Sequence, residues 1–212
     1  MTSPDWKYEG KMWKRGFSLT AGIDEVGRGS FAGPVVAGCV VFSDETQIPV
    51  EIRINDSKKL TEIQRNKASE WIWKNAHAVG VGKASVTQIN KLGIKKASEI
   101  AFRKSIVNSK VKVDHLLIDA FYIPYVRGLR RKNQLAIVKG DSKSFSIAAA
   151  SIIAKVYRDE LMTKLSRLSR YKKYGWGENK GYGTQRHRQA IKKYGSTSKH
   201  RKQFVESSLK KD

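Results

Sequence analysis

The sequence AGIDEVGRGSFAGP occupies residues 21–34 and is the most informative stretch of the chain. A short apolar run, residues 19–23, leads into two adjacent acids, Asp24 and Glu25, and then into a glycine-rich turn that contains Arg28. The glycines allow backbone N–H groups to approach a ligand closely, and the guanidinium offers a fork of donors to a phosphate. Carboxylates for metal ions beside donors for phosphate are typical of a site that cleaves phosphodiesters.

Outward from this stretch, apolar runs predict a mixed α/β fold. Strands are predicted at about 18–23, 34–42, 77–85, 115–119 and 135–138, and helices at about 61–75, 93–108, 143–168 and 184–194. Three strands with short connections, followed by two strands that helices separate, indicate a mixed five-stranded sheet flanked by helices. We expect residues 1–17 to form an N-terminal extension, 18–168 the catalytic domain, and 169–212 a small helical, basic C-terminal lobe.

The charge of the chain indicates a polyanionic partner. Its 212 residues include 42 Lys and Arg against 19 Asp and Glu, which gives a net charge of +23. A solvated basic surface without a partner is the alternative, and an anionic membrane is disfavoured because no long basic amphipathic segment stands out. No apolar run resembles a membrane span or a signal peptide, and the lone Cys39 is predicted to be a buried hydrophobe. These features predict a cytoplasmic protein.

Four carboxylates are the candidate metal ligands. Each lies at or just after the C-terminal end of a predicted strand, where ligands bind in open α/β sheets: Asp24, Glu25, Asp119 and Asp141. Converging there, each close pair would repel by about 4 kcal/mol at an effective dielectric constant near 20. Two hard divalent cations, Mg²⁺ or Mn²⁺, relieve that repulsion, and a two-metal site can activate water and stabilise a leaving oxygen. One cysteine and four scattered histidines offer no zinc-ligand spacing.

Other roles for these acids stay open at this stage. Asp141 is a plausible helix N-cap, and Asp119 a turn residue. Asp24 and Glu25 would point to opposite faces of an extended strand, so a turn is expected to bring both to one metal pair. Asp159 is a rival for the fourth position, but it lies about 27 Å from Asp141 along a continuous helix. We expect Asp159 to pair with Arg158 or a neighbouring base instead.

The chain resembles the ribonuclease HII family. The resemblance is carried by residues 21–34 and, in family order, by NDSKKLT (55–61), LLID (116–119), VKGDSKS (138–144), SIAAASIIAKVYRD (146–159) and NKGYGT (179–184) with His187. It extends over about residues 18–204 and implies a ribonuclease H-like fold. It also implies an endonuclease that uses Mg²⁺ or Mn²⁺, cuts the RNA of RNA–DNA hybrids, and nicks duplex DNA on the 5′ side of embedded ribonucleotides. The expected ends are 3′-hydroxyl and 5′-phosphate, with no covalent nucleophile on the protein.

The resemblance also implies roles for substrate-binding residues. Gly27, Arg28 and Gly29 would meet the sugar edge of the ribonucleotide and the junction phosphate, which allows contact with the 2′-OH. The same glycines match a dinucleotide-binding pattern, but a β-rich run rather than a helix follows them. Ser57 and Lys58 would meet phosphates, unless they are ordinary solvated surface.

Tyr182 would stack on the sugar that follows the ribonucleotide, unless it is a core tyrosine. The role of His187 is left open, and Gln203 stands where the family usually has serine. The implied partners are RNA–DNA hybrids and duplex DNA containing ribonucleotides, without a membrane. The chain is expected to be monomeric, and a contact with a replication clamp is unproven.

Two other functions fit parts of the sequence. A junction-resolving nuclease of the same fold would share the acids but lack the ribose-reading turn. A non-catalytic basic nucleic-acid-binding protein would account for the charge, but it leaves the placement of the four acids unexplained.

Overall fold

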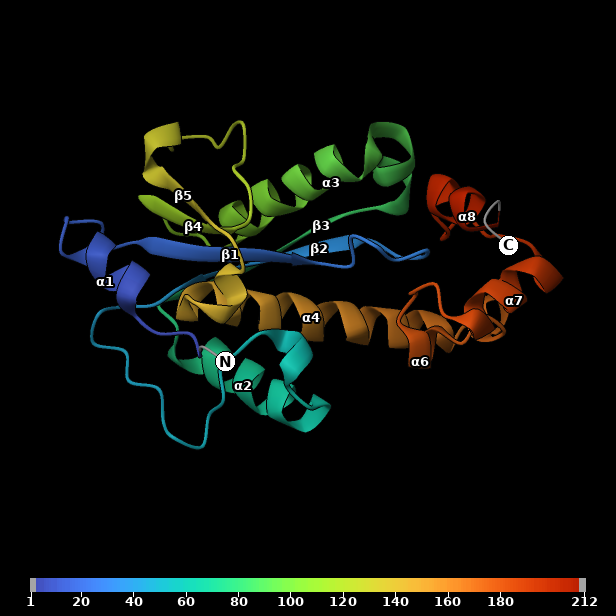
Figure 1. The fold of residues 1–212 in the computed structure, drawn as a ribbon, viewed down its shortest axis with the longest axis horizontal. Helices are drawn as coiled ribbons and strands as arrows, with labels where there is room; N and C mark the ends of the chain where they lie inside the picture. Colours follow the sequence, from blue (N-terminus) through green and yellow to red (C-terminus); the bar gives the residue numbers. More distant parts are fainter. Residues whose placement is uncertain (1–2, 210–212) are drawn as a thin grey trace.

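One five-stranded sheet forms the centre of the computed structural model, which describes residues 3–209 (Figure 1). The strands are β1 (Thr20–Val26), β2 (Val35–Val41), β3 (Ala78–Ala84), β4 (His115–Asp119) and β5 (Gln134–Ile137). Their order is β3-β2-β1-β4-β5. The first three pair antiparallel, and β4 pairs parallel with both β1 and β5. The predicted mixed five-stranded sheet is therefore confirmed.

Helices cover both faces of this sheet. Helix α3 (Val86–Asn108) lies on one face, and α4 (Phe145–Ser166) with α2 (Glu62–Asn75) lies on the other (Figure 1). Helix α4 comes close to the sheet because Gly22 and Gly38 lack side chains. A Cβ added to them would lie 2.1 Å from the carbonyl carbon of Ser146 and 2.3 Å from the carbonyl oxygen of Ala150. Small residues on both sides thus hold α4 directly beneath β1.

Helix α3 begins earlier than the sequence predicts. Its first residue is Val86 rather than residue 93, and Ser85 and Gln88 form a reciprocal capping box at its start. Gly93, with φ 78°, kinks the element. The helical spacing of apolar residues therefore predicted only the part of α3 that follows Gly93.

The first residues are folded against the sheet. Helix α1 (Lys7–Trp13) lies where the sequence predicts only an extension. The Trp6 ring lies 5.3 Å from that of Phe42 and 4.8 Å from that of Phe145. Met12 joins a small apolar cluster with buried side chains of β4, β5 and α4. This segment is consequently part of the same packed unit as the sheet.

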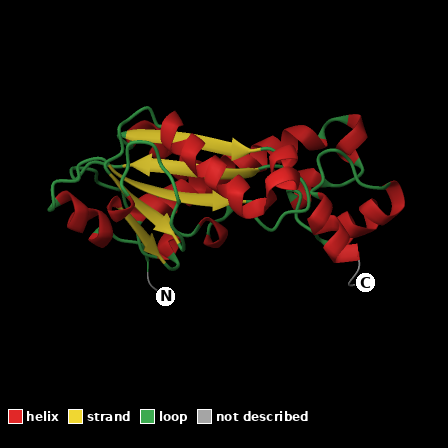
Figure 2. Ribbon diagram, turned by 90° about the horizontal axis from the view of Figure 1, so that it is seen from above, coloured by secondary structure: helices red, strands yellow, loops and turns green. Residues whose placement is uncertain are grey.

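The C-terminal lobe lies at one end of the sheet (Figure 2). It contains α5 (Ser169–Lys172), α6 (Trp176–Asn179), α7 (Gln185–Tyr194) and α8 (Lys202–Leu209). Helix α7 matches the predicted helix at 184–194, whereas α5, α6 and α8 are not predicted. Trp176, Tyr171 and Tyr174 form an aromatic core in the lobe, with ring centroids 4.9 and 5.5 Å from that of Trp176.

Cys39 is buried in β2, as predicted. Within residues 3–209, no helix combines the length and the apolar character that crossing a membrane requires.

Candidate active site

Strand β1 continues through the two adjacent acids. The sequence predicts that the strand ends near residue 23 and that a turn presents Asp24 and Glu25; this is wrong, because they pair with Gly38 and Ala37 inside the β1–β2 ladder. On the other side, β4 pairs with β1 only as far as Ile23–Ile118. The sheet is therefore open beside the acids, and no turn is needed for both to reach the same cleft.

A cleft of about 700 Å³ lies at this open edge. Every residue that the sequence predicts for the site lines it: Asp24, Glu25, Gly27, Arg28, Gly29, Ser57, Lys58, Asp119, Asp141 and Tyr182. Val26, Leu60, Arg65, Ser151 and Lys155 also line the cleft and are not predicted. The structure thus brings together residues from β1, β4, α2, α4 and four loops or short turns.

The carboxylates perturb one another strongly. Burial, followed by the charges of Glu25 and Asp119, raises the pKa of Asp24 well above its usual value. Burial raises the pKa of Glu25 to about 7, with Asp119 adding to the shift and Arg28 opposing it. Burial, Asp56 and Asp119 raise the pKa of Asp141. Partly buried acids that repel one another in this way are stabilised by a bound cation.

Hydrogen bonds orient three of these carboxylates. Asp119 Oδ1 accepts from the Gly140 N–H at 2.8 Å, and Asp24 Oδ1 accepts from the Glu25 N–H at 2.7 Å. Glu25 Oε1 lies 3.1 Å from Arg28 Nη1. Within residues 3–209, no three His, Cys, Asp or Glu side chains form a ready-made metal cluster. The donor set, all carboxylate oxygens in one cleft, nevertheless suits a hard divalent cation that would draw them together.

Neither rival role for the acids is observed. Ser144, not Asp141, caps α4, and Asp141 lies in the short 3₁₀ turn η3 (Gly140–Ser142). Asp159 forms an ion pair with Lys155 at 2.8 Å, which confirms the expected pairing with a neighbouring base. Its partner Lys155 lines the cleft, whereas Asp159 does not.

The Gly-Arg-Gly turn is held from beneath by Arg158 of α4. This buried guanidinium donates to the carbonyl oxygens of Pro34, Ala32 and Lys180 at 3.0, 3.1 and 2.9 Å. Gly27 has φ 89°, and a Cβ there would lie 2.2 Å from Arg158 Nε. Only glycine therefore fits at that position.

A second buried guanidinium, that of Arg201, supports the same turn. Its Nη1 and Nε donate to the carbonyl oxygens of Arg28 and Gly33 at 2.7 and 3.0 Å. Burial and the nearby Arg158 lower the pKa of Arg201 to about 9. No acid within residues 3–209 forms an ion pair with either arginine. Arg201 lies two residues before Gln203, which is exposed.

The loop of Tyr182 is fixed by His187. Trp176 Nε1 donates to His187 Nε2 at 3.0 Å, so the proton of His187 lies on Nδ1, which is 2.9 Å from the Tyr182 carbonyl oxygen. His187 is buried and does not line the cleft. The half-buried Tyr182 ring lies 5.3 Å from the Arg158 guanidinium carbon and 5.7 Å from Lys155 Nζ. His187 therefore holds the backbone of Tyr182 through this hydrogen bond.

Ser57 and Lys58 approach the cleft from a separate 3₁₀ turn, η1 (Ser57–Lys59). Ser57 Oγ lies 2.9 Å from Ser151 Oγ, and Arg65 Nη1 donates to the Ser57 carbonyl oxygen at 2.6 Å. Lys58, the residue after the buried Ser57, is exposed. Its position suits a contact with a phosphate at the mouth of the cleft.

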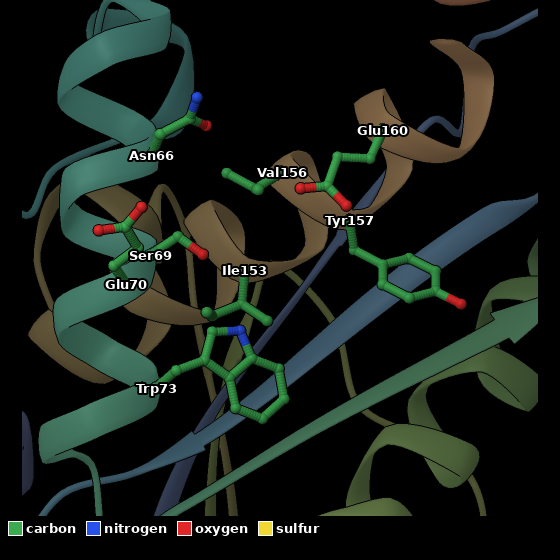
Figure 3. A pocket seen from close by; sticks show the side chains of 8 residues that line it. All are labelled: Asn66, Ser69, Glu70, Trp73, Ile153, Val156, Tyr157 and Glu160. Atoms are coloured by element: carbon green, nitrogen blue, oxygen red, sulfur yellow. The ribbon is translucent and has the colours of Figure 1, made fainter. Parts of the chain in front are cut away.

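A second, smaller pocket lies between α2 and α4, away from the predicted residues. Its volume is about 310 Å³, and its lining includes Glu70, Trp73 and Glu160 (Figure 3). Among the described residues, no glycine turn and no lysine or arginine line it. Its chemistry is consequently not that of a phosphodiester site.

Comparison with known proteins agrees with this geometry. A family model described as ribonuclease HII matches residues 21–210. A ribonuclease HII of Caldanaerobacter subterraneus subsp. tengcongensis is 47% identical over 203 residues, which are 96% of this chain and 80% of that protein. The crystal structure of ribonuclease H2 from Pyrococcus horikoshii OT3 is similar with a TM-score of 0.70 and 26% identity, over 91% of this chain and 97% of that one.

A further similar structure is that of the PCNA:RNase HII complex from Archaeoglobus fulgidus. It has a TM-score of 0.68 and 28% identity, over 86% of this chain and 93% of that one. The family model spans nearly the whole sequence, and the match to the bacterial relative has far more than the identity needed to establish homology. The chain is therefore a member of the ribonuclease HII family of nucleases.

Proposed function

We propose that this protein is a metal-dependent endonuclease that hydrolyses the RNA strand of RNA–DNA hybrids and nicks duplex DNA on the 5′ side of embedded ribonucleotides. One observation carries the proposal: four carboxylates and the Gly27–Arg28–Gly29 turn line a single cleft of a strongly basic protein. The acids suit metal ions, the turn suits a ribose and its phosphate, and the net charge of +23 suits a polyanionic duplex. Family membership supports the same reading.

Asp24, Glu25, Asp119 and Asp141 would hold two Mg²⁺ or Mn²⁺ ions. When bound, such a pair supplies an activated water on one side of the phosphodiester and charge stabilisation for the leaving oxygen on the other. The protein residues carry out the remaining tasks. Lys58 and Lys155, which line the cleft, attract the phosphates, and Arg28, which is bonded to Glu25 at 3.1 Å, meets the substrate in the same cleft. No side chain acts as a covalent nucleophile, and the products carry 3′-hydroxyl and 5′-phosphate ends.

Recognition of the ribonucleotide is assigned to the turn and to Tyr182. Gly29 is exposed, and an added Cβ there would have no neighbour within 4 Å, so the backbone is accessible to a sugar edge. Backbone groups at such a position can contact the 2′-OH that distinguishes RNA from DNA. The Tyr182 ring lies in the same cleft, where it can stack on the following deoxyribose.

A cleavage assay with three duplexes tests the function. An RNA–DNA hybrid, a DNA duplex with one ribonucleotide and an all-DNA duplex are incubated with Mn²⁺ or Mg²⁺, with and without EDTA. We expect cutting of the first two only, and none with EDTA. Equal cutting of all three would favour a same-fold nuclease of other specificity, such as a junction-resolving enzyme. Binding without turnover would favour a non-catalytic nucleic-acid-binding protein.

Tyr182→Ala is expected to slow cleavage while the protein stays folded. Loss of stacking on the sugar should cost about 1–3 kcal/mol, by analogy with aromatic–base contacts. The loss should be largest on the single-ribonucleotide duplex, which has one scissile position. Measurement of the melting temperature and of both cleavage rates decides between recognition and packing. A destabilised variant with unchanged substrate preference would make Tyr182 a core residue, and Tyr122→Ala, at an exposed tyrosine outside the cleft, is the control.

Three further expectations stay predictions for this chain: a monomeric state, a cytoplasmic location and a contact with a replication clamp. The last has a counterpart in the Archaeoglobus protein, whose structure was solved in complex with PCNA. Co-elution of the protein with a clamp in gel filtration would test it.

A further inference from the structure

A buried carboxylate outside the cleft, that of Glu9 on helix α1, is attached to the start of helix α4. Glu9 is 0% exposed. Its Oε1 accepts from the Ser144 hydroxyl at 2.6 Å and from the Ser146 N–H at 2.8 Å. No lysine or arginine within residues 3–209 forms an ion pair with it. The role of this acid is therefore separate from surface charge pairing.

The N-terminal segment completes the first turn of α4. Ser144 caps the helix by accepting from the Ile147 N–H at 3.2 Å, while it donates its own hydroxyl proton to Glu9. The Phe145 N–H donates to the Asp5 carbonyl oxygen at 3.2 Å. The first N–H groups of a helix lack partners within the helix. Glu9 Oε1 supplies a partner for one of them, the Ser146 N–H.

The same contacts lead directly to two of the four carboxylates. The Ser144 N–H donates to the Gly140 carbonyl oxygen at 2.9 Å, and the Gly140 N–H donates to Asp119 Oδ1 at 2.8 Å. Asp141 lies between these two residues in the η3 turn. A continuous series of hydrogen bonds thus runs from Glu9 through Ser144 and Gly140 to Asp119, and the segment it holds carries Asp141.

The pKa of the Glu9 carboxyl lies above its usual value. Burial raises it, and the hydrogen bonds from Ser144 and Ser146 oppose part of that rise. Its Oε2 is buried without a hydrogen-bond partner among the described residues. Only Oε1 therefore holds α4, and an amide oxygen in the same place could accept the same two bonds.

We propose that Glu9 is a positioning residue for the metal site: through Ser144 and Gly140 it sets the placement of Asp119 and Asp141. This inference rests on the proposed function, because it assumes that these two acids bind metal. Residues behind the ligands of a metal site typically change metal affinity by about 10–100-fold when they are removed. Because Glu9 acts two residues further away, through Ser144 and Gly140, we expect a smaller effect of about three- to tenfold.

The test compares Glu9→Ala and Glu9→Gln in the full chain. Lys11→Ala, an exposed position on the same helix, is the matched control. The readouts are Mn²⁺ affinity by titration calorimetry, the Mn²⁺ concentration that gives half-maximal cleavage, and KM for an RNA–DNA hybrid. Glu9→Ala should weaken Mn²⁺ binding and raise the half-maximal concentration by about three- to tenfold, with KM unchanged. Glu9→Gln should stay close to wild type because its carbonyl oxygen can accept both bonds.

The outcomes separate this inference from the proposed function. A wild-type protein that binds Mn²⁺ and cuts hybrid, beside a Glu9→Ala variant that only melts earlier, would overturn the positioning role alone. A Glu9→Gln variant as impaired as Glu9→Ala would also overturn it. If Glu9→Ala does not fold, Ser144→Ala removes the same link while the Glu9–Ser146 bond remains, and an unchanged Mn²⁺ affinity in it counts against the proposal. A wild type that neither binds Mn²⁺ nor cuts would overturn the proposed function, and this inference with it.

Discussion

Asp119→Asn is expected to abolish cleavage of RNA–DNA hybrids while the protein remains folded and still binds them at low salt. Asparagine keeps the shape of the side chain, and its amide oxygen can still accept the Gly140 N–H that Asp119 Oδ1 accepts at 2.8 Å. What is lost is the negative charge of one of the four candidate metal ligands. The charge of Asp119 contributes to the raised pKa values of Asp24, Glu25 and Asp141, and all four carboxylates line one cleft.

We expect a loss of cleavage rate of about 1,000-fold or more, equivalent to about 4 kcal/mol of transition-state stabilisation. Binding should survive because it depends mainly on lysine and arginine contacts to phosphates. The measurements are single-turnover cleavage with Mn²⁺, hybrid binding at low salt and the melting temperature. Asp44→Asn, an exposed acid far from the cleft in sequence, is the control. Near-normal turnover by Asp119→Asn would leave Asp119 as a turn residue and remove the basis of the metal site.

Arg158→Met is expected to reduce stability strongly and to impair recognition of the ribonucleotide. The substitution leaves three backbone carbonyls, those of Ala32, Pro34 and Lys180, without the donor that now reaches them. The carbonyls of Ala32 and Pro34 belong to the segment that follows the Gly-Arg-Gly turn, and that of Lys180 to the segment before Tyr182, so Arg158 joins these two segments. The substitution removes buried hydrogen bonds from a charged group and leaves their acceptors unpaired. We therefore expect the free energy of unfolding to fall by about 3–5 kcal/mol.

Chemical denaturation measures this loss, and cleavage at a temperature well below the melting point measures the effect on recognition. The rate should fall more on a duplex with one ribonucleotide than on a long hybrid. Arg158→Lys should be intermediate, because a single ammonium cannot reach three carbonyls in different directions. Arg167→Met, at an exposed arginine at the end of the same helix, is the control. A variant as stable and as selective as that control would show that the turn does not depend on Arg158.

Many residues of the candidate site could be predicted from their neighbours in the sequence. The predicted residues of the cleft include short-range features: acids after apolar runs, glycines around an arginine, and a tyrosine between two glycines. Each of them could be identified because the physical reason for it lies within a few positions along the chain. Even so, the expected turn at Asp24 was wrong, since whether a strand continues depends on a partner strand that lies elsewhere in the sequence.

The supporting residues could not be identified in that way. Arg158, Arg201 and Glu9 are buried charged side chains, and nothing in their neighbourhoods along the chain distinguishes them from surface charges. Their partners are remote: Arg201 lies 173 positions from Arg28, and Glu9 lies 137 positions from Ser146. Helix α1 was missed for the same reason, because its contacts with β4, β5 and α4 hold it in place and it has no clear hydrophobic period of its own.

By itself the sequence predicted the positions of the five strands along the chain, the strongly basic composition and the four candidate carboxylates, because apolar runs, composition and strand ends are local properties of the chain. Only the tertiary structure decided that β1 runs on through Asp24 and Glu25 and that β4 stops at Asp119, which opens the edge of the sheet where the acids meet. It also decided that two buried arginines hold the Gly-Arg-Gly turn and that Glu9 caps the helix behind Asp141. Desolvated charges such as these are stable only where backbone groups from distant segments converge on them, and that convergence is a property of the folded chain.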